Sequence, residues 1–111
     1  GTLIGLPRPF STPSTSGVFQ ELYYWDTYFI NVGLLASGQT KQAANNIENM
    51  FYLIDRFGWM PNGNRTFYLC RSQPPFLSQM VRELFAHTQD QAWSLSGIAA
   101  GILVLAYAPD A

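Results

Sequence analysis

The stretch Phe19–Phe29, written FQELYYWDTYF, has the residue types best suited to chemistry in this chain. Six of its eleven residues are aromatic, and the carboxylates Glu21 and Asp26 lie among them. Burying a carboxylate beside aromatic rings is costly unless the carboxylate has hydrogen-bond partners or a function. A sugar suits such a place, because its C–H face packs on rings and its hydroxyl groups donate to carboxylates. The stretch therefore suggests a sugar pocket as a first hypothesis.

Two further polar clusters, at 62–65 and 71–73, lie in a segment rich in proline and glycine. Arginine, asparagine and glutamine side chains offer donors and acceptors that can hold neighbouring hydroxyl groups of a ligand. The alternative is that these side chains staple the loop through Asx-turns and arginine-to-carbonyl hydrogen bonds. Either role is compatible with the sequence.

A complete pair of catalytic carboxylates is not visible. Glycoside hydrolysis uses two carboxyl groups about 5–9.5 Å apart. Glu21 and Asp26 are five positions apart, which on a helix separates them by roughly 140° around the axis. The carboxylates on polar faces of the predicted helices are expected to be solvated: Glu48, Asp55 and Glu83. We therefore expect no catalytic residue here.

The composition limits the partners. Hydrophobic residues make up 48% of the 111 residues and charged residues 12%, about half the usual charged share. Such a surface is expected to face other protein, and exposed apolar helix faces could support self-association. The net charge of −1 argues against nucleic acid, which is bound through basic patches. With one histidine and one cysteine, a four-ligand zinc site is not expected, and we expect no cofactor.

The segments that would position these residues alternate between apolar runs and breakers. Prolines make residues 1–18 an extended lead-in. Residues 24–36 are apolar nearly all round, which favours an internal helix over the competing buried strand. Residues 40–57 carry one apolar stripe at helical spacing and end before Gly58. We therefore predict an antiparallel helical hairpin over 24–57.

The second half begins with a long loop, predicted over 58–75 and expected to be functional because of its length. A helix is predicted from about 76 to 88, and an apolar run beyond Trp93 would complete a second hairpin over 76–108. That run is shorter than the roughly 20 residues that cross a bilayer. A buried helix is favoured, and membrane association through 97–108 is the alternative. The predicted fold class is all-α, built from helical hairpins.

Two motifs resemble a known family. PSTSGVFQELYYWDTYF resembles the first signature of the trehalase family of glycoside hydrolases, P-G-G-R-F-x-E-x-Y-x-W-D-x-Y, and PNGNRTFYLCRSQPPF resembles the family's following loop, PNGNRxYYLxRSQPPF. They occur in the family's order and at a family-like separation. The resemblance covers residues 6–93, and the tail after Trp93 does not share it.

The resemblance implies an (α/α)6 barrel that hydrolyses α,α-trehalose to glucose with inversion, of which residues 1–111 would be a partial segment. Its general acid and base would lie downstream of these motifs, in segments this chain lacks, so the resemblance implies that the chain alone is inactive. It also implies that side chains of both motifs line the glucose pocket: Phe19, Tyr23, Trp25, Asp26, Asn62, Arg71 and Gln73. Asp26 would accept from glucose hydroxyls, and Arg71 would orient chemistry at the anomeric carbon.

The sequence departs from the signature just before Phe19. Val18 replaces the family's arginine, and Pro13-Ser14-Thr15-Ser16-Gly17 replaces the P-G-G lead-in. Another α-glucoside or an α-mannoside is therefore an alternative substrate to trehalose. A non-catalytic helical module that binds sugar or protein is the alternative from another functional class. Glu21 is predicted to be structural, paired with an arginine of the 58–75 loop.

Overall fold

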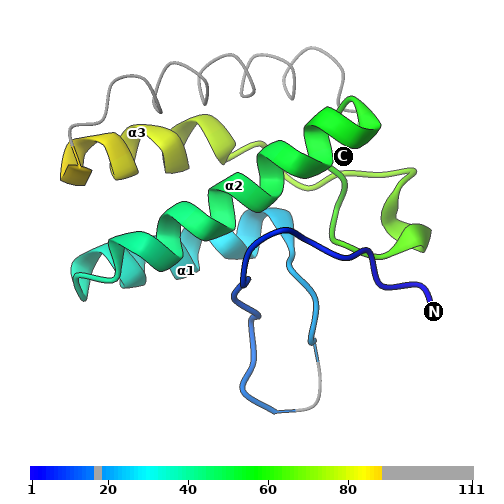
Figure 1. Cartoon of the computed structure of the whole chain (residues 1–111), viewed down its shortest axis with the longest axis horizontal. Helices are drawn as coiled ribbons and strands as arrows, with labels where there is room; N and C mark the ends of the chain where they lie inside the picture. Colours follow the sequence, from blue (N-terminus) through cyan, green and yellow to red (C-terminus); the bar gives the residue numbers. More distant parts are fainter. Residues whose placement is uncertain (17–18, 89–111) are drawn as a thin grey trace.

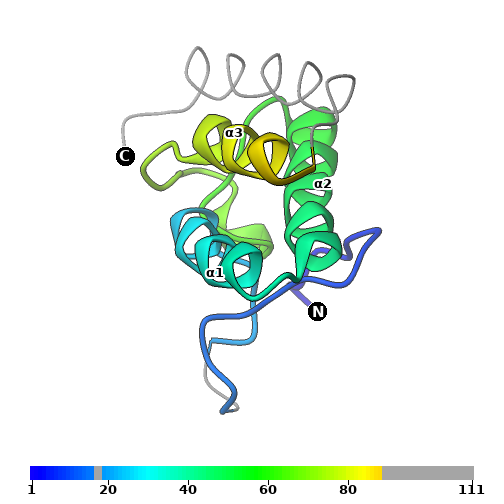
Figure 2. The same ribbon diagram turned by 90° about the vertical axis from the view of Figure 1, so that its left-hand side faces the viewer.

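The computed structural model describes residues 1–16 and 19–88 as three packed α-helices joined by irregular segments. The helices are α1 (Tyr24–Ala36), α2 (Thr40–Phe57) and α3 (Leu77–Thr88), and a short 3-10 turn covers Thr66–Tyr68. In Figure 1, α2 runs back alongside α1, and α3 packs against both of them. Figure 2 shows the three helices around a shared interior. The predicted all-α fold class is confirmed over these residues.

The apolar stripe of α2 forms the centre of the core, as its spacing predicts. The buried apolar residues of this helix recur every three or four positions: Ala43, Ile47, Met50, Leu53 and Ile54. Gly58 ends the helix in the left-handed conformation at φ 84°, where its N–H donates to the Ile54 carbonyl at 2.7 Å. Glycine has no Cβ to oppose this conformation, so it makes a sharp helix end.

Among the described residues, the packing partners of helix α1 cover one of its faces. The sequence predicts an internal helix here, but the buried residues of α1 are Tyr24, Thr27, Asn31 and Leu35. Within the described part of the chain, its other face leaves Trp25, Phe29 and Val32 between 39% and 54% exposed. Asn31 faces α2 and is satisfied there: it donates to the Ala43 carbonyl at 3.3 Å. The apolar face of α1 is thus turned outward.

The proline-rich lead-in is held on α2 by two asparagine side chains. Asn46 Oδ1 accepts from the Ser11 N–H at 2.9 Å, and Asn49 Oδ1 accepts from the Arg8 N–H at the same distance. Asn49 also donates to the Arg8 carbonyl at 3.0 Å. These side chains satisfy backbone groups that have no helix or sheet partners. The lead-in is therefore fixed without regular secondary structure.

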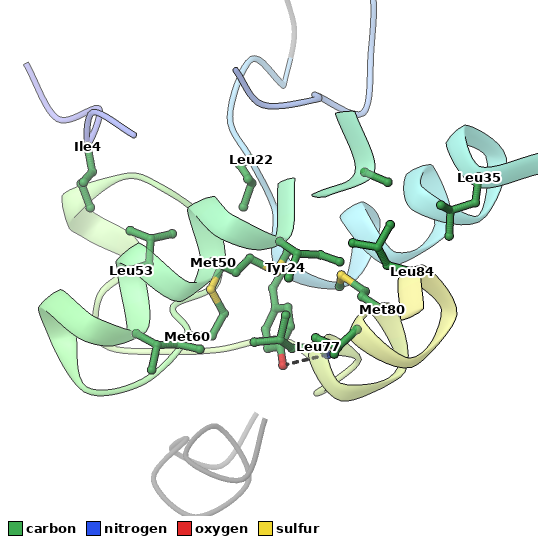
Figure 3. Packing of buried hydrophobic residues seen from close by; sticks show 14 residues of the cluster. Ile4, Leu22, Tyr24, Leu35, Met50, Leu53, Met60, Leu77, Met80 and Leu84 are labelled. Atoms are coloured by element: carbon green, nitrogen blue, oxygen red, sulfur yellow. Dashed lines mark hydrogen bonds between the residues drawn. The ribbon is translucent and has the colours of Figure 1, made fainter. Parts of the chain in front are cut away.

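Tyr24 links α1 to the start of α3 inside the core. Its hydroxyl accepts from the backbone N–H of Leu77 at 3.2 Å, the contact drawn as a dashed line in Figure 3. Tyr24 is fully buried, and this burial raises the pKa of its hydroxyl above the ordinary value. The first N–H groups of a helix have no partner within the helix. One buried tyrosine therefore fixes where α3 begins.

Residues beyond Thr88 are outside the described ranges. The predicted second half of the 76–108 hairpin and the alternative of membrane association through 97–108 both fall there. Among the helices that are described, none has the length and apolar character needed to cross a membrane.

Candidate functional site

The N-terminus of α1 is capped by the 58–75 loop. Tyr23, the N-cap residue, is extended (φ −112°, ψ 142°) and makes no capping bond through its side chain within the described residues. Instead, the Tyr24 N–H donates to the Asn62 carbonyl, and the Trp25 N–H donates to Gln73 Oε1, both at 3.0 Å. The exposed N–H groups at this helix end are thus satisfied by a distant segment. The same contacts hold the two motif segments together.

Asn64 joins the loop to residue 22 from within the core. Its fully buried side chain accepts from the Leu22 N–H at 2.9 Å and donates to the Ile4 carbonyl at 3.1 Å. Its backbone N–H donates to the Leu22 carbonyl at 3.2 Å. For this residue of the 62–65 cluster, the structural alternative is the right one.

Gly63 allows the two segments to approach closely. It pairs with Tyr23 in an isolated antiparallel bridge. A Cβ at this position would lie 2.9 Å from the Leu22 carbonyl oxygen and 3.1 Å from the Tyr68 ring. Only glycine therefore fits between these backbones without displacement.

An open hollow of about 360 Å³ lies where the lead-in, the start of α1 and the loop meet. This volume is at the small end for ligand sites. Aromatic and polar side chains line it together: Pro13, Phe19, Tyr23, Asp26, Tyr68 and Gln73. Among these residues Asp26 is the only acid. The hollow can therefore hold a small polar ligand, and the described residues of its lining include no pair of catalytic carboxylates.

Four of the seven residues predicted for the glucose pocket line this hollow: Phe19, Tyr23, Asp26 and Gln73. The side chain of Trp25 is 39% exposed and packs edge-on against Phe29, with ring centroids 5.7 Å apart. Asn62 takes part through its backbone, because its N–H also donates to the Arg71 carbonyl at 2.8 Å. The structure therefore brings all seven into one region, with three of them beside the hollow rather than in its wall.

Arg71 lies over a wall residue. Its guanidinium is 5.2 Å from the centre of the Tyr68 ring, within the range of a cation–π contact. The side chain of Arg71 is exposed, so its donors stay available. Val18, which replaces the arginine of the signature, lies outside the described residues.

Phe19 holds an unusual backbone conformation. Its φ is +57°, and its ring is 58% exposed while lying edge-on to Tyr23, with centroids 6.3 Å apart. Positive φ is uncommon for a residue with a Cβ, especially a bulky one. Strained residues of this kind cluster at functional sites, which favours a ligand-facing role for this ring.

Glu21 and Arg65 form an ion pair next to the hollow. Arg65 Nε lies 2.8 Å from Glu21 Oε1, and the side chains are 25% and 14% exposed. Burial alone would raise the pKa of Glu21, but hydrogen bonds from Tyr23 and Arg65, with the Arg65 charge, outweigh it and lower this pKa. Glu21 is therefore ionised and paired with an arginine of the loop, as predicted.

Two wall residues, Tyr68 and Pro13, were not among the residues predicted for the pocket. Tyr68 lies in the PNGNRTFYLCRSQPPF motif, three positions before Arg71. That position inside a motif of site residues was an available signal. Pro13 carries no comparable signal, because its place depends on how the lead-in folds over α2.

Comparisons with known proteins give a consistent result. Residues 2–101 match the family described as Trehalase. The chain is 52% identical over 91 residues to a periplasmic trehalase of Xanthomonas oryzae pv. oryzae, covering 82% of this chain and 16% of that protein. It is 50% identical over 80 residues to a periplasmic trehalase of Pseudomonas aeruginosa, covering 72% and 14%. The chain thus spans about 16% of the length of such relatives.

The structural comparison points the same way. Neutral trehalase Nth1 from Saccharomyces cerevisiae matches 90% of this chain with a TM-score of 0.75 and 31% identity, using 22% of its own length. This match confirms the prediction that the helices are part of an (α/α)6 barrel. The family match also runs to residue 101, so the prediction that the resemblance ends at Trp93 was wrong for 94–101.

Proposed function

This chain belongs to the trehalase family, and we propose that it supplies part of the glucose-binding subsite of a trehalase-type glycoside hydrolase. The reaction would be hydrolysis of α,α-trehalose to glucose with inversion. The chain's share would be to hold and orient one glucose unit, while the catalytic carboxylates come from other segments of the enzyme. The residues assigned to this subsite are Phe19, Tyr23, Trp25, Asp26, Asn62, Arg71 and Gln73.

The observation that carries the proposal is the lining of the 360 Å³ hollow, to which three aromatic residues contribute together with Asp26 and Gln73. The Asp26 carboxylate accepts hydrogen bonds only. Gln73 uses its Oε1 to accept from the Trp25 N–H, which leaves its Nε2 protons as donors. Acceptors and donors beside aromatic rings match the hydroxyl groups and C–H face of a hexose.

The residues beside the wall extend the same interpretation. Arg71, exposed over the Tyr68 ring, would reach the anomeric side of a bound sugar. Trp25, with 39% of its surface exposed, would offer an outer ring face. Another α-glucoside or an α-mannoside stays the alternative substrate, because Val18 stands where the family signature has arginine.

A protein-interaction role is a second candidate, favoured by one observation. Trp25, Phe29 and Val32 form an exposed apolar face on α1. Surfaces of this kind often mark contacts with protein, and self-association through this face would be the simplest form. The two candidate functions differ in where a ligand binds. A sugar would bind in the hollow, whereas a protein would bind on the exposed face of α1.

Chemical-shift mapping by NMR tests the proposal. Glucose and trehalose are added to the isotope-labelled chain, and the shifted backbone resonances are assigned. Shifts centred on Asp26, Tyr68 and Gln73 support the sugar subsite. Shifts that depend on protein concentration instead of sugar, and centre on Phe29 and Val32, support the interaction role and contradict the proposal.

A further inference from the structure

A chain of hydrogen bonds runs from the Glu21–Arg65 ion pair into the wall of the hollow. Arg65 Nε donates to Glu21 Oε1 at 2.8 Å, and the Tyr23 hydroxyl donates to Glu21 Oε2 at 2.9 Å. The Tyr23 and Tyr68 hydroxyl oxygens lie 3.2 Å apart, and both tyrosines line the hollow. Glu21 and Arg65 are not among the wall residues.

Only one arrangement of the Tyr23 and Tyr68 hydroxyl protons is consistent with these hydrogen bonds. An ionised carboxylate can only accept, and each tyrosine hydroxyl has a single proton. Since the Tyr23 proton goes to Glu21, the Tyr23 oxygen must accept from Tyr68. The Tyr68 proton is then used as well. Both phenol oxygens are left with lone pairs and without a free proton for a ligand.

Arg65 fixes the donor-to-acceptor direction of these hydrogen bonds, which runs from Tyr68 through Tyr23 to Glu21. Its guanidinium is always charged and only donates, so it requires an oxygen on the Glu21 side. The bond angles of the carboxylate then present the second oxygen to Tyr23. Burial of Tyr23 and the adjacent Glu21 charge both raise the pKa of the Tyr23 hydroxyl, so its proton stays in place.

We propose that Glu21 and Arg65 are positioning residues that fix the hydroxyl protons of Tyr23 and Tyr68 and so make this wall an acceptor surface. With Asp26 on the same hollow, the surface takes neutral ligands whose hydroxyl groups donate. Against the two phenol oxygens it disfavours the carboxylate group of a sugar, because lone pairs would then face lone pairs. The proposal rests on the sugar subsite proposed above and specifies its preferred ligand class.

The substitution Glu21→Gln reverses the direction of the hydrogen bond between residue 21 and the Tyr23 hydroxyl. Arg65 still needs an oxygen, so the new amide turns its Oε1 to Arg65 and its NH₂ group to Tyr23. Tyr23 then accepts instead of donating, and its proton points toward Tyr68 or the hollow. We expect glucose affinity to fall about three- to tenfold, the equivalent of one hydrogen bond.

A double-mutant cycle separates positioning from a structural effect. If Glu21 acts through the Tyr23 hydroxyl, Glu21→Gln costs no further affinity in a Tyr23→Phe background. The exchange Glu21→Arg with Arg65→Glu restores the ion pair, yet leaves Tyr23 facing a donor. We expect this double variant to regain thermal stability and not glucose affinity. Equal losses in both backgrounds, or regained affinity in the exchange variant, would overturn the proposal.

A second measurement needs no ligand. In the parent chain, the Tyr23 hydroxyl proton should exchange slowly and resonate downfield by NMR, because it is hydrogen-bonded to the Glu21 carboxylate. In Glu21→Gln that resonance should move upfield or disappear by exchange. An unchanged resonance overturns the proposed proton arrangement. If the parent binds neither glucose nor glucuronate, the sugar subsite itself fails, whatever the hydroxyl resonance shows. The Arg71→Ala variant removes the guanidinium over Tyr68, and tighter binding of glucuronate than of glucose by this variant overturns the acceptor surface alone.

Discussion

The backbone N–H of Trp25 donates to Oε1 of Gln73 at 3.0 Å, although the two residues are 48 positions apart. Gln73 also lines the hollow. One side chain therefore caps a helix with its oxygen and offers its NH₂ group to a ligand. The same side chain serves helix capping and the proposed ligand binding, so substitutions are needed to separate its effect on stability from its effect on sugar affinity.

Two substitutions of Gln73 make that separation. Gln73→Ala leaves the Trp25 N–H without its cap and should lower the free energy of unfolding by about 1 kcal/mol. Gln73→Glu keeps an acceptor and places negative charge at a helix N-terminus, which is favourable, but removes the NH₂ donor. We expect Gln73→Glu to retain the stability of the parent and to lose glucose affinity. Thermal unfolding and sugar titration of both variants check this; equal stability of all three chains would contradict the capping role.

Asn64 should matter more for stability than its neighbour Asn62. Asn64→Ala leaves the Leu22 N–H and the Ile4 carbonyl buried without partners, at a cost of roughly 2–4 kcal/mol. Asn62→Ala is the matched control, since the hydrogen bonds of Asn62 in the described residues come from its backbone. Denaturant unfolding measures both. A loss in Asn62→Ala as large as in Asn64→Ala would contradict this assignment.

The helices could be predicted from the sequence because their signals are local. The apolar spacing of α2 and the stop at Gly58 lie within one segment, and the structure has α2 at Thr40–Phe57 and α1 at Tyr24–Ala36. The walls of the hollow are different. Tyr68 and Pro13 come together with Asp26 because the loop packs on the start of α1 and the lead-in packs on α2. The spacing of residues within one segment does not reveal such contacts between segments.

The exposed face of α1 is a second feature that the sequence did not predict. The near absence of polar residues in 24–36 predicts an internal helix, whereas α1 buries Thr27 and Asn31 and exposes Trp25 and Phe29. Within the described residues, hydrogen bonds let both polar side chains lie on the buried face beside Tyr24 and Leu35. Asn31 is satisfied by the Ala43 carbonyl and by Asn46, so burying it costs little.

Acidification should weaken the contribution of Glu21 to stability. The pKa of Glu21 is lowered below its ordinary value of 4.5 in the folded chain, so the unfolded chain binds this proton at higher pH than the folded one does. The stabilisation is therefore complete above about pH 5 and is lost as the pH falls through the lowered folded pKa. We expect the stability difference between the parent and Glu21→Gln to shrink over that range in urea unfolding. A difference that grows with acidity would have the wrong sign.

Gly63 and Gly33 should respond to alanine in opposite directions. Gly63→Ala places a methyl group 2.9 Å from the Leu22 carbonyl, and overpacking of this kind costs about 1–3 kcal/mol. Gly33 lies inside α1, where an added methyl group would meet no atom within 4 Å beyond its own helix backbone, so Gly33→Ala should stabilise the helix by up to about 1 kcal/mol. Thermal unfolding of both variants provides the comparison. Stabilisation by Gly63→Ala would show that the two motif segments do not approach as closely as described.

Glucose affinity of the Asp26→Asn variant tests the central claim most directly. Asp26 lines the hollow, whereas Asp55 is exposed on α2, so Asp55→Asn is the matched control for loss of one charge. By NMR titration, the parent and Asp55→Asn should bind glucose with equal affinity, at about millimolar Kd. Asp26→Asn should bind about tenfold more weakly, since a charged acceptor is lost. Equal affinities of Asp26→Asn and the parent, or no binding by the parent, would contradict the proposed subsite.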